Sequence, residues 1–524
     1  MRHRLAIVLL STVGLAAQSP PAAPAAHPGT RLLAGGGRLP AEIFARFHEL
    51  AGGAHAKVVL IPTASETADD DKENADTLRL YRERLPGAEV SLLHTRDRAV
   101  ADDEAFCTPL ARATGVWITG GAQDRLASAY LGTRVEKELL AVLARGGVIG
   151  GTSAGTAIQT RTMIQEGMDP PVMATGFDFV PGAISDQHFL KRQRLPRLLR
   201  ALALHPGLFG IGVDESTAAV VHGDALDVIG ASKVFLVLPE HDGHARVVVE
   251  RAAGARVDLA AWRRAARERA TWSWTDPASP RVAAGTLLLG DSGDSFQRFV
   301  AFAGGKAARV LVVFHGDGHH AYHSDTSTGF RELHEIRLTG PGAVSADELA
   351  KSIADATGVW LQDETPSAAS AILDTAYVPQ LRAALNELLA RGGVVWGHAL
   401  LGEVVTDAQP ALDDANPATA CRRGLALLPG SAMECSDPIA SPKQAVRNAN
   451  EEQTDLRRLS ALCPPRFTGI RVVGSAVVQG AELSPADDSS ATILPSSKAA
   501  GDAEREPIHL GPGTHYDLIT GKRR

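Results

Sequence analysis

The chain has 524 residues, of which 44% are apolar and 22% charged, and its formal net charge is −7 at pH 7. This balance is typical of a globular protein, so it excludes wholesale disorder and gives no basic footprint for nucleic acid. Four cysteines without a C-x-x-C pair exclude a disulfide scaffold and a zinc ribbon. The length predicts two or three domains, at about 100–200 residues per domain.

The N-terminus has the pattern of a secretory signal peptide. A basic start at 1–4 precedes the apolar run Leu5–Leu15 and the small pair 16–17. We expect a signal peptide at 1–17 and a Pro/Ala-rich linker at 18–29; a buried N-terminal strand is the alternative. No later run reaches the roughly 18 apolar residues of a membrane helix. The sequence thus predicts an exported, soluble protein, periplasmic or extracellular, in which disulfides are permitted and no membrane partner remains after signal cleavage.

Strands and helices alternate through the first half of the chain. The apolar pattern predicts strands at Lys57–Ile61, Glu89–Leu93, Val116–Thr119 and Val148–Gly151, and helices at Ala75–Leu85, Ala101–Ala113 and Val135–Arg145. This alternation indicates an α/β fold, a doubly wound and mostly parallel sheet covered on both faces. In such sheets, sites form at the carboxyl ends of the strands.

A repeat of a whole domain appears when the two halves are compared. The matching segments have the same order in both halves: 51–65 with 303–317, 113–121 with 356–364, 139–155 with 385–402, 176–182 with 424–430, and 254–259 with 513–518. The sequence therefore predicts two tandem copies of one fold, at 30–265 and 284–524. Residues 266–283 form the connector.

The segment Gly151–Gly155 fits the pattern G-x-S-x-G. It follows a predicted strand and precedes a helix predicted at Ala154–Thr160, which is the strand–turn–helix context of a nucleophile elbow. The alternative is a structural turn serine, because so Gly-rich a chain supplies the motif by chance. The context favours Ser153 as a nucleophile.

A serine nucleophile needs a base and an orienting carboxylate. His188 and Glu215 can serve, since Glu215 follows another apolar run. Each also has a plainer interpretation, as one of 18 histidines and as a solvated acid at a strand end. Spacing alone does not select these two residues.

The first copy resembles the cyanophycinases, in the serine peptidase family that also contains aspartyl dipeptidase E. The resemblance lies in five segments, TGGAQDRL from Thr119, GGTSAGTAI from Gly150, GFDFVPGAISDQHFLKRQRLPRLLRAL from Gly176, GIGVDESTAAVV from Gly210 and DVIGASKVFLV from Asp227. The motif DQHF followed by spaced arginines is typical of the cyanophycinase branch. The family's fold resembles that of class I glutamine amidotransferases, which agrees with the strand–helix pattern.

The resemblance implies a role for each matching residue. Ser153 would be the nucleophile, His188 the general base and acid, and Glu215 its orienting partner. The N–H groups of Gly121 and Ala154 would form the oxyanion hole. The substrate-pocket positions of the family match Gln123, Asp186, Gln187, Arg192, Arg194 and Arg197. No metal or organic cofactor is implied.

The substrate follows by the same analogy. The resemblance implies exolytic cleavage of cyanophycin, multi-L-arginyl-poly-L-aspartate, to β-Asp-Arg dipeptides. The arginines would bind carboxylates of this polymer, and Asp186 or Glu166 its guanidinium groups; spacing alone favours a solvated helix face for the arginines. Alternatives are a peptidase of the same family acting on aspartyl or isoaspartyl dipeptides, and a non-catalytic protein that binds a polymer.

The second copy lacks every catalytic residue of the first. Alignment places Ala399 opposite Ser153, Ser436 opposite His188, Gly474 opposite Glu215, Asp363 and Glu364 opposite Gly120 and Gly121, and Pro366 opposite Gln123. The apolar runs persist, so we expect an inactive domain kept for packing, with the two copies forming an intramolecular pseudo-dimer.

Smaller features leave alternatives open. Residues His315–His323 contain four histidines and one aspartate, which can bind zinc or form a solvated polar loop. Cys421, Cys435 and Cys463 permit a disulfide without showing which two would pair. Cys107 is expected to be buried. The acidic run at 69–71 either begins a helix at the surface or attracts an arginine-rich polymer.

Overall fold

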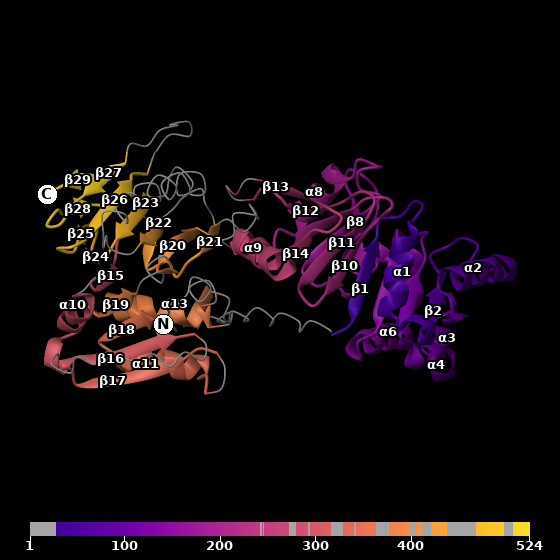
Figure 1. The fold of residues 1–524 in the computed structure, drawn as a ribbon, viewed down its shortest axis with the longest axis horizontal. Coiled ribbons are helices and arrows are strands. Elements are labelled where there is room, and N and C mark those ends of the chain that lie inside the picture. The colour runs from indigo at the N-terminus through magenta and orange to yellow at the C-terminus, as the bar shows by residue number, and fades with distance from the viewer. Residues whose placement is uncertain are drawn as a thin grey trace, which may run out of the picture.

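A computed structural model of the chain forms two α/β regions, the first from indigo to magenta in Figure 1 and the second from rose through orange to yellow. The structure describes residues 28–241, 244, 246–271, 279–291, 294–315, 329–339, 342–362, 372–373, 377–398, 404–410, 421–436, 468–496 and 507–524. The predicted signal peptide and most of the linker lie outside these residues.

The main sheet of the first region has eight strands in the order β14-β11-β10-β1-β5-β4-β2-β3. These strands are β1 (Thr30–Ala34), β2 (Lys57–Ile61), β3 (Glu89–Leu92), β4 (Gly115–Ile118), β5 (Val148–Thr152), β10 (Thr217–His222), β11 (Ala225–Gly230) and β14 (Arg256–Asp258). Strands β1 to β5 pair in parallel, and β10, β11 and β14 extend the sheet antiparallel from β1. The α/β class predicted from the sequence is confirmed, with a mixed sheet.

Helices cover both faces of this sheet. Strand β2 shows why, because Val58 and Leu60 pack into one apolar cluster and Val59 and Ile61 into another. The first cluster includes side chains of α1 (Ala41–Leu50) and α2 (Asp71–Arg84), and the second includes those of α4 (Glu104–Arg112) and α6 (Arg134–Ala144). The sheet is thus buried on both faces.

The first region contains a further, four-stranded sheet, which the apolar pattern of the sequence does not predict. Its order is β13-β12-β9-β8, from β8 (Ala183–Gln187), β9 (Phe209–Val213), β12 (Lys233–Leu238) and β13 (Val247–Ala252). Helix α8 (Leu195–Leu204) packs on it, and β6 (Thr162–Glu166) and β7 (Val172–Thr175) form a separate hairpin. This sheet carries two of the residues expected at the site.

Several predicted helices differ in extent from those observed. The helix expected at Ala101–Ala113 is two helices, α3 (Arg98–Ala101) and α4, because the Asp103 side chain caps α4 by accepting the Phe106 N–H. Helix α2 begins at Asp71 because Asp70 caps it, so the acidic run is a surface helix start. Helix α5 (Gln123–Tyr130) was missed, and α7 (Ala154–Ala157) is shorter than expected.

The second region has its own nine-stranded sheet, in the order β17-β16-β18-β19-β15-β24-β25-β28-β29. Its strands are β15 (Thr286–Gly290), β16 (Arg309–Phe314), β17 (Glu332–Arg337), β18 (Gly358–Gln362), β19 (Val394–Gly397), β24 (Ser475–Gln479), β25 (Glu482–Pro485), β28 (Tyr516–Asp517) and β29 (Lys522–Arg523). From β17 to β28 the order and pairing directions match those from β3 to β14 in the first region.

Further strands form a six-stranded sheet, ordered β21-β20-β22-β23-β26-β27. They are β20 (Thr406–Pro410), β21 (Cys421–Arg423), β22 (Leu428–Ser436), β23 (Thr468–Val473), β26 (Ser490–Leu494) and β27 (Ile508–Leu510). The helices of this region include α10 (Ser295–Phe302), α11 (Ala346–Asp355) and α13 (Val378–Ala390). Strands β22 and β23 pair in parallel, as β8 and β9 do in the first region.

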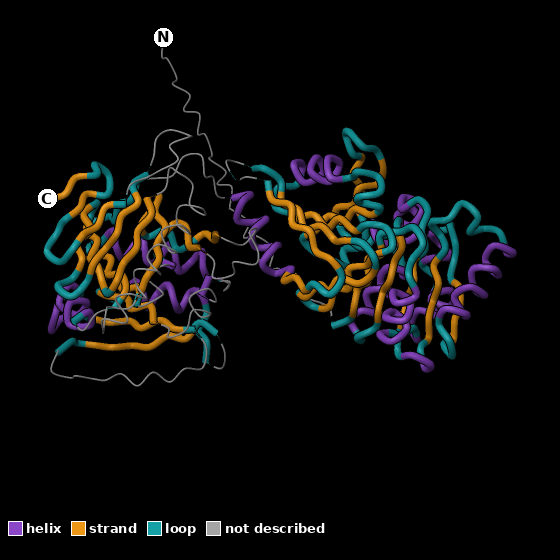
Figure 2. The backbone as a smooth tube through the Cα atoms, turned by 45° about the horizontal axis from the view of Figure 1, so that its top comes forward, coloured by secondary structure: helices purple, strands orange, loops and turns teal. Residues whose placement is uncertain are grey.

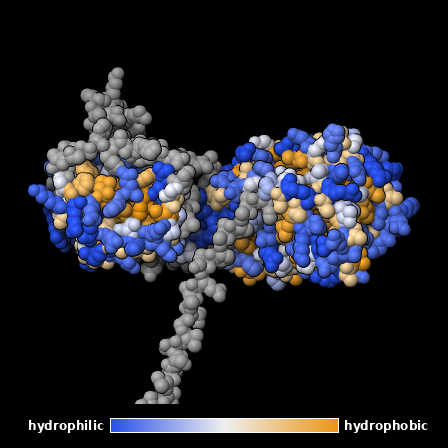
Figure 3. Space-filling model, turned by 90° about the horizontal axis from the view of Figure 1, so that it is seen from below, coloured by the Kyte–Doolittle hydropathy of each residue, from blue (hydrophilic) through white to orange (hydrophobic). Residues whose placement is uncertain are grey.

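Helix α9 (Leu259–Thr271) lies between the two regions in Figures 1 and 2 and continues through residue 265, where a boundary was expected. Its Glu268 accepts a hydrogen bond from the Arg423 N–H of the second region, at 3.3 Å. In Figure 3 apolar residues gather on the visible face of the second region, whereas the first region shows a largely hydrophilic surface with scattered apolar residues. Among the residues described, no helix has the length and apolarity that crossing a membrane requires.

Candidate active site

Ser153 stands in the turn between β5 and α7, with φ 52° and ψ −107°. The flanking glycines make this turn possible. A Cβ on Gly151 would lie 2.0 Å from the Gly155 carbonyl oxygen, and one on Gly155 would lie 2.1 Å from that of Ile118. The Ser153 N–H donates to the Ala34 carbonyl at 3.1 Å, which fixes the turn to β1. The G-x-S-x-G motif is therefore a strained elbow that presents the serine hydroxyl.

His188 and Glu215 meet Ser153 at the carboxyl ends of their strands. His188 follows β8 and Glu215 follows β9 by two residues. The Ser153 hydroxyl donates to His188 Nε2 at 2.9 Å, and His188 Nδ1–H donates to Glu215 Oε1 at 2.7 Å. This is the hydrogen-bonded order of a nucleophile, a base and an orienting carboxylate.

The environment of His188 favours its neutral form. Burial lowers the pKa of the imidazole from its ordinary 6.5, and the charge of Arg192 lowers it further. The hydrogen bond to Glu215 opposes both effects without cancelling them. A neutral imidazole can accept the serine proton at neutral pH.

The Arg192 charge gives a prediction on pH dependence. A lowered pKa keeps His188 neutral to a lower pH, so the acid limb of the kcat/KM profile lies below pH 6.5. In Arg192→Ala the pKa rises, and we expect the limb to move to higher pH. Arg192→Lys keeps the charge and is expected to leave the limb in place. An Arg192→Ala profile with an unmoved limb contradicts this prediction, whatever happens to KM.

The two N–H groups expected in the oxyanion hole belong to the residue after Ser153 and to the loop after β4, where a Cβ on Gly120 would lie 3.5 Å from Ser153 Cβ. Gly121 follows β4 with φ 141°, and a Cβ there would lie 2.0 Å from the Ala64 carbonyl oxygen, so only glycine fits. Ala154 is the first residue of α7. Within the described part of the chain, neither N–H has an acceptor. Both donors are free to bind negative charge developing on a substrate oxygen.

Two glycines after β1 were missed from the sequence. A Cβ on Gly36 would lie 2.3 Å from His188 Cε1, and one on Gly37 would lie 2.7 Å from Glu215 Oε2. The Gly35 carbonyl also accepts the His188 N–H, at 2.8 Å. The sequence signal that could have indicated these glycines is the run of three consecutive glycines that ends an apolar segment.

Gly36→Ala is expected to lower kcat by about a hundredfold or more, because the new methyl group displaces the His188 ring. The measurement is steady-state kinetics on purified, folded protein. Gly53→Ala is the matched control, since Gly53 also has a positive φ but has open space where a Cβ would stand. Equal kinetics for the two variants would contradict the prediction.

Asp214, also missed, holds the turn that follows His188. Its carboxylate is buried and accepts the N–H groups of Leu190 and Lys191, at 2.9 and 3.0 Å, and the Ser232 hydroxyl at 2.7 Å. This matters because His188 has φ 52°, a conformation that needs support.

The expected substrate-binding residues divide into buried and exposed groups. Arg194 and Arg197 are buried, so the interpretation of the arginines as a solvated helix face was wrong for these two. Arg192 is exposed. Gln187 is buried at the end of β8, and Gln123 is buried with its amide donating to the carbonyls of Ile164 and Gln165.

In the structure, arginines of the chain itself bind Asp186, where a substrate guanidinium was expected. Its side chain is fully buried and bound by Arg197, through Nε at 3.0 Å and through Nη2, and by Arg194 Nη1 at 3.3 Å. Burial lowers the pKa of Arg194 to about 10, which leaves it charged at neutral pH. Glu166, the other acid considered, is exposed at the end of β6.

The second region lacks this arrangement where it is described. Gly474 follows Gly469 by the same number of residues as Glu215 follows Gly210, so no carboxylate stands there. The positions opposite Ser153, Gly121 and Gln123 lie outside the described residues, as does most of the segment His315–His323. In the described residues, no three metal-binding side chains are grouped to hold an ion.

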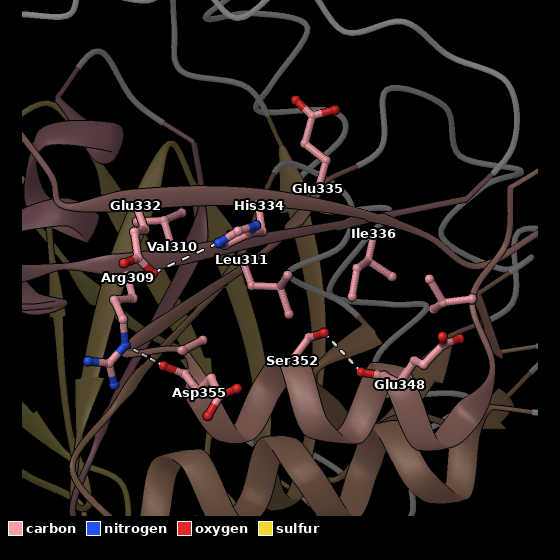
Figure 4. A pocket seen from close by; sticks show the side chains of 12 residues that line it. Arg309, Val310, Leu311, Glu332, His334, Glu335, Ile336, Glu348, Ser352 and Asp355 are labelled. Carbon is pink, nitrogen blue, oxygen red and sulfur yellow. Dashed lines mark hydrogen bonds and ion pairs between the residues drawn. The ribbon is translucent and has the colours of Figure 1, made fainter.

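A cavity of about 440 Å³ opens between β17 and α11 in the second region (Figure 4). Its rim is acidic, and several of its polar groups bond to one another. Arg309 Nε donates to the Asp355 carbonyl, and the Ser352 hydroxyl to that of Glu348. None of the expected site residues lines it.

The cysteines give one structural result. Cys107 is buried and unpaired, as expected, and burial raises the pKa of its thiol to about 11. Cys421 and Cys435 lie in β21 and β22, whereas Cys463 is outside the described residues.

The α/β fold, the serine elbow and its hydrogen-bonded histidine and glutamate define a serine hydrolase site. Residues 32–229 match Peptidase family S51. The chain is 34% identical over 223 residues to a cyanophycinase of Geminocystis herdmanii, covering 40% of this chain and 80% of that one. The chain therefore belongs to serine peptidase family S51.

Other relatives are similar in the same part of the chain. A cyanophycinase of Trichormus variabilis is 36% identical over 214 residues, covering 39% of this chain and 70% of that one. One of Synechococcus elongatus is 35% identical over 210 residues, covering 38% of this chain and 63% of that relative's length. A crystal structure of a peptidase from an acI-B1 Actinobacterium is 24% identical, with a TM-score of 0.37, and covers 45% of this chain and 98% of that one.

Proposed function

We propose that this protein is an exopeptidase that hydrolyses cyanophycin to β-Asp-Arg dipeptides through an acyl-enzyme. The observation that carries the proposal is the hydrogen-bonded series from Ser153 through His188 to Glu215, at 2.9 and 2.7 Å. The substrate is supported by the relatives named as cyanophycinases and by the exposed Arg192, whose N–H donates to the His188 carbonyl.

The proposed reaction runs in two halves. Ser153 Oγ attacks the scissile carbonyl carbon while His188 Nε2 takes its proton, and the N–H groups of Gly121 and Ala154 bind the oxyanion. His188 then donates the proton to the leaving amine, which breaks the peptide bond. In the second half, His188 accepts a proton from water as it attacks the acyl-enzyme, and returns it to Ser153. Glu215 keeps the imidazole in the required tautomer throughout.

We propose further that the second region is an inactive counterpart of the first, and that the protein is exported. The first statement is supported by the shared strand order and by Gly474 at the position of Glu215. The second is supported by the basic start and apolar run of residues 1–17. N-terminal sequencing of protein secreted from a host would test the second.

The test of the function is digestion of insoluble cyanophycin, followed by mass spectrometry, with Ser153→Ala as the blank. Release of β-Asp-Arg by the native protein alone supports the substrate, the bond and the nucleophile together. Cleavage of small Asp-X or isoaspartyl dipeptides without polymer release would assign the site to dipeptides instead. If the protein releases no product from either substrate and a serine-reactive probe does not label Ser153, the proposal of an enzyme is overturned. A role in binding a polymer would then remain.

A further inference from the structure

A further cavity lies in the first region, between the loop after β1, helix α1 and the end of α2. Its volume is about 820 Å³, within the range of small-ligand sites. Its polar lining includes Arg38, His48, Glu83 and Arg84, and its apolar lining includes Leu39 and Pro40.

The cavity is tied to the triad through the loop after β1. Gly37, which packs against the Glu215 carboxylate, is followed directly by Arg38. The Ser216 hydroxyl donates to the Arg38 carbonyl at 2.9 Å, and Ser216 is the neighbour of Glu215. The same loop therefore packs against the triad and lines the cavity.

The cationic groups of the cavity are available to a ligand. The Arg84 guanidinium lies over the Phe44 ring, 4.3 Å from its centroid, at a distance that allows a cation–π interaction. Neither Arg38 nor Arg84 has an ion-pair or hydrogen-bond partner for its side chain within the residues that the structure describes. Helix α1 begins at the cavity without a side-chain cap, so its positive end adds to the attraction for an anion.

The charges of the cavity match those of one amide-linked arginine. Such a unit carries a free carboxylate and a guanidinium, joined by an aliphatic chain. Arg38 and Arg84 are suited to the carboxylate, exposed Glu83 to the guanidinium, and Leu39 and Pro40 to the chain. A simple anion would leave Glu83 unused.

We propose that this cavity is a second binding site for the polymer, which holds an arginyl unit by its carboxylate and guanidinium. The proposal rests on the proposed function and adds to it a contact outside the catalytic pocket. The site holds the polymer near Ser153 between cleavage events, so its effect falls on KM for long substrates.

Direct binding tests the cavity without any turnover. The probe is N-acetyl-L-arginine, which has the acylated amine, carboxylate and guanidinium of the polymer unit. Binding is followed by the NMR signal of the His48 imidazole, identified by its loss in His48→Gln. We expect a saturable shift in the native protein and about tenfold weaker binding in Arg38→Ala/Arg84→Ala. N-acetylagmatine, which lacks the carboxylate, is expected to shift this signal little.

The matched control is Arg79→Ala, because Arg79 is exposed on α2, pairs with Asp76 and does not line the cavity. It should bind the probe as the native protein does. No His48 shift in the native protein, or an equal shift in the double variant, would overturn the proposal.

Kinetics separates this proposal from the proposed function. In Arg38→Ala/Arg84→Ala we expect KM for cyanophycin to rise about tenfold with kcat unchanged, and kcat/KM for a two-unit fragment to stay constant. Equal losses on both substrate lengths would overturn the second site. If the native protein does not cut cyanophycin, the proposed function fails, and the binding experiment alone decides whether the cavity takes an arginyl unit.

Discussion

Ser153→Ala is expected to lower kcat on cyanophycin by at least about 10⁴-fold, with KM and the fold little changed. The hydroxyl is the atom that attacks the carbonyl, and no other described hydroxyl is hydrogen-bonded to His188. The fold should be unaffected because the backbone N–H of residue 153 still donates a hydrogen bond to the Ala34 carbonyl. Only the hydrogen bond from the Ser153 hydroxyl to His188 is lost. The measurements are turnover by mass spectrometry and the unfolding midpoint of both proteins.

The control is Ser216→Ala. Ser216 also has a positive φ and stands next to Glu215, but its hydroxyl donates to the Arg38 carbonyl rather than to His188. It is expected to retain most of the activity on short fragments. A serine-reactive probe should label native protein and Ser216→Ala, and leave Ser153→Ala unlabelled. More than about a tenth of native turnover in folded Ser153→Ala would contradict the proposed nucleophile.

Sequence patterns within a short segment were sufficient to identify Ser153 as a candidate nucleophile. Ser153 lies between a strand and a helix that are visible in the sequence, and the glycines on either side have the steric reason given above. His188 and Glu215 are brought to it by the pairing of β8 with β9 and by the His188 N–H bond to Gly35. Such long-range contacts leave no periodic signal, so only the family resemblance singled these residues out.

The burial of Arg197 could have been predicted from the spacing of apolar residues in its helix. In α8, Arg197 shares a face with the buried Ala201, four residues on, and precedes the buried Leu198. Helical spacing therefore places Arg197 on the buried side, and a buried guanidinium requires a partner carboxylate. That partner, Asp186, lies on β8, which was not predicted as a strand.

The same burial makes Asp186→Ala the most destabilising change that we expect in the first region. It leaves the buried Arg197 and Arg194 without their shared carboxylate, and breaking such a pair costs about 3–5 kcal/mol of unfolding free energy. Urea unfolding measures the effect, with the slope compared between variants to confirm that the same structure unfolds. Activity alone would not separate this role from substrate binding, since loss of the fold also abolishes turnover.

Glu250→Ala is the control, because Glu250 pairs with Lys233 at the surface, where an ion pair is worth about 1 kcal/mol or less. A further variant, Asp186→Asn, keeps the shape and two polar atoms but not the charge, so it should fall between alanine and the native residue. If Asp186→Ala loses no more stability than Glu250→Ala yet loses activity, Asp186 acts on the substrate rather than on the fold. The family resemblance, which placed Asp186 in the substrate pocket, would then describe its role better than its burial does.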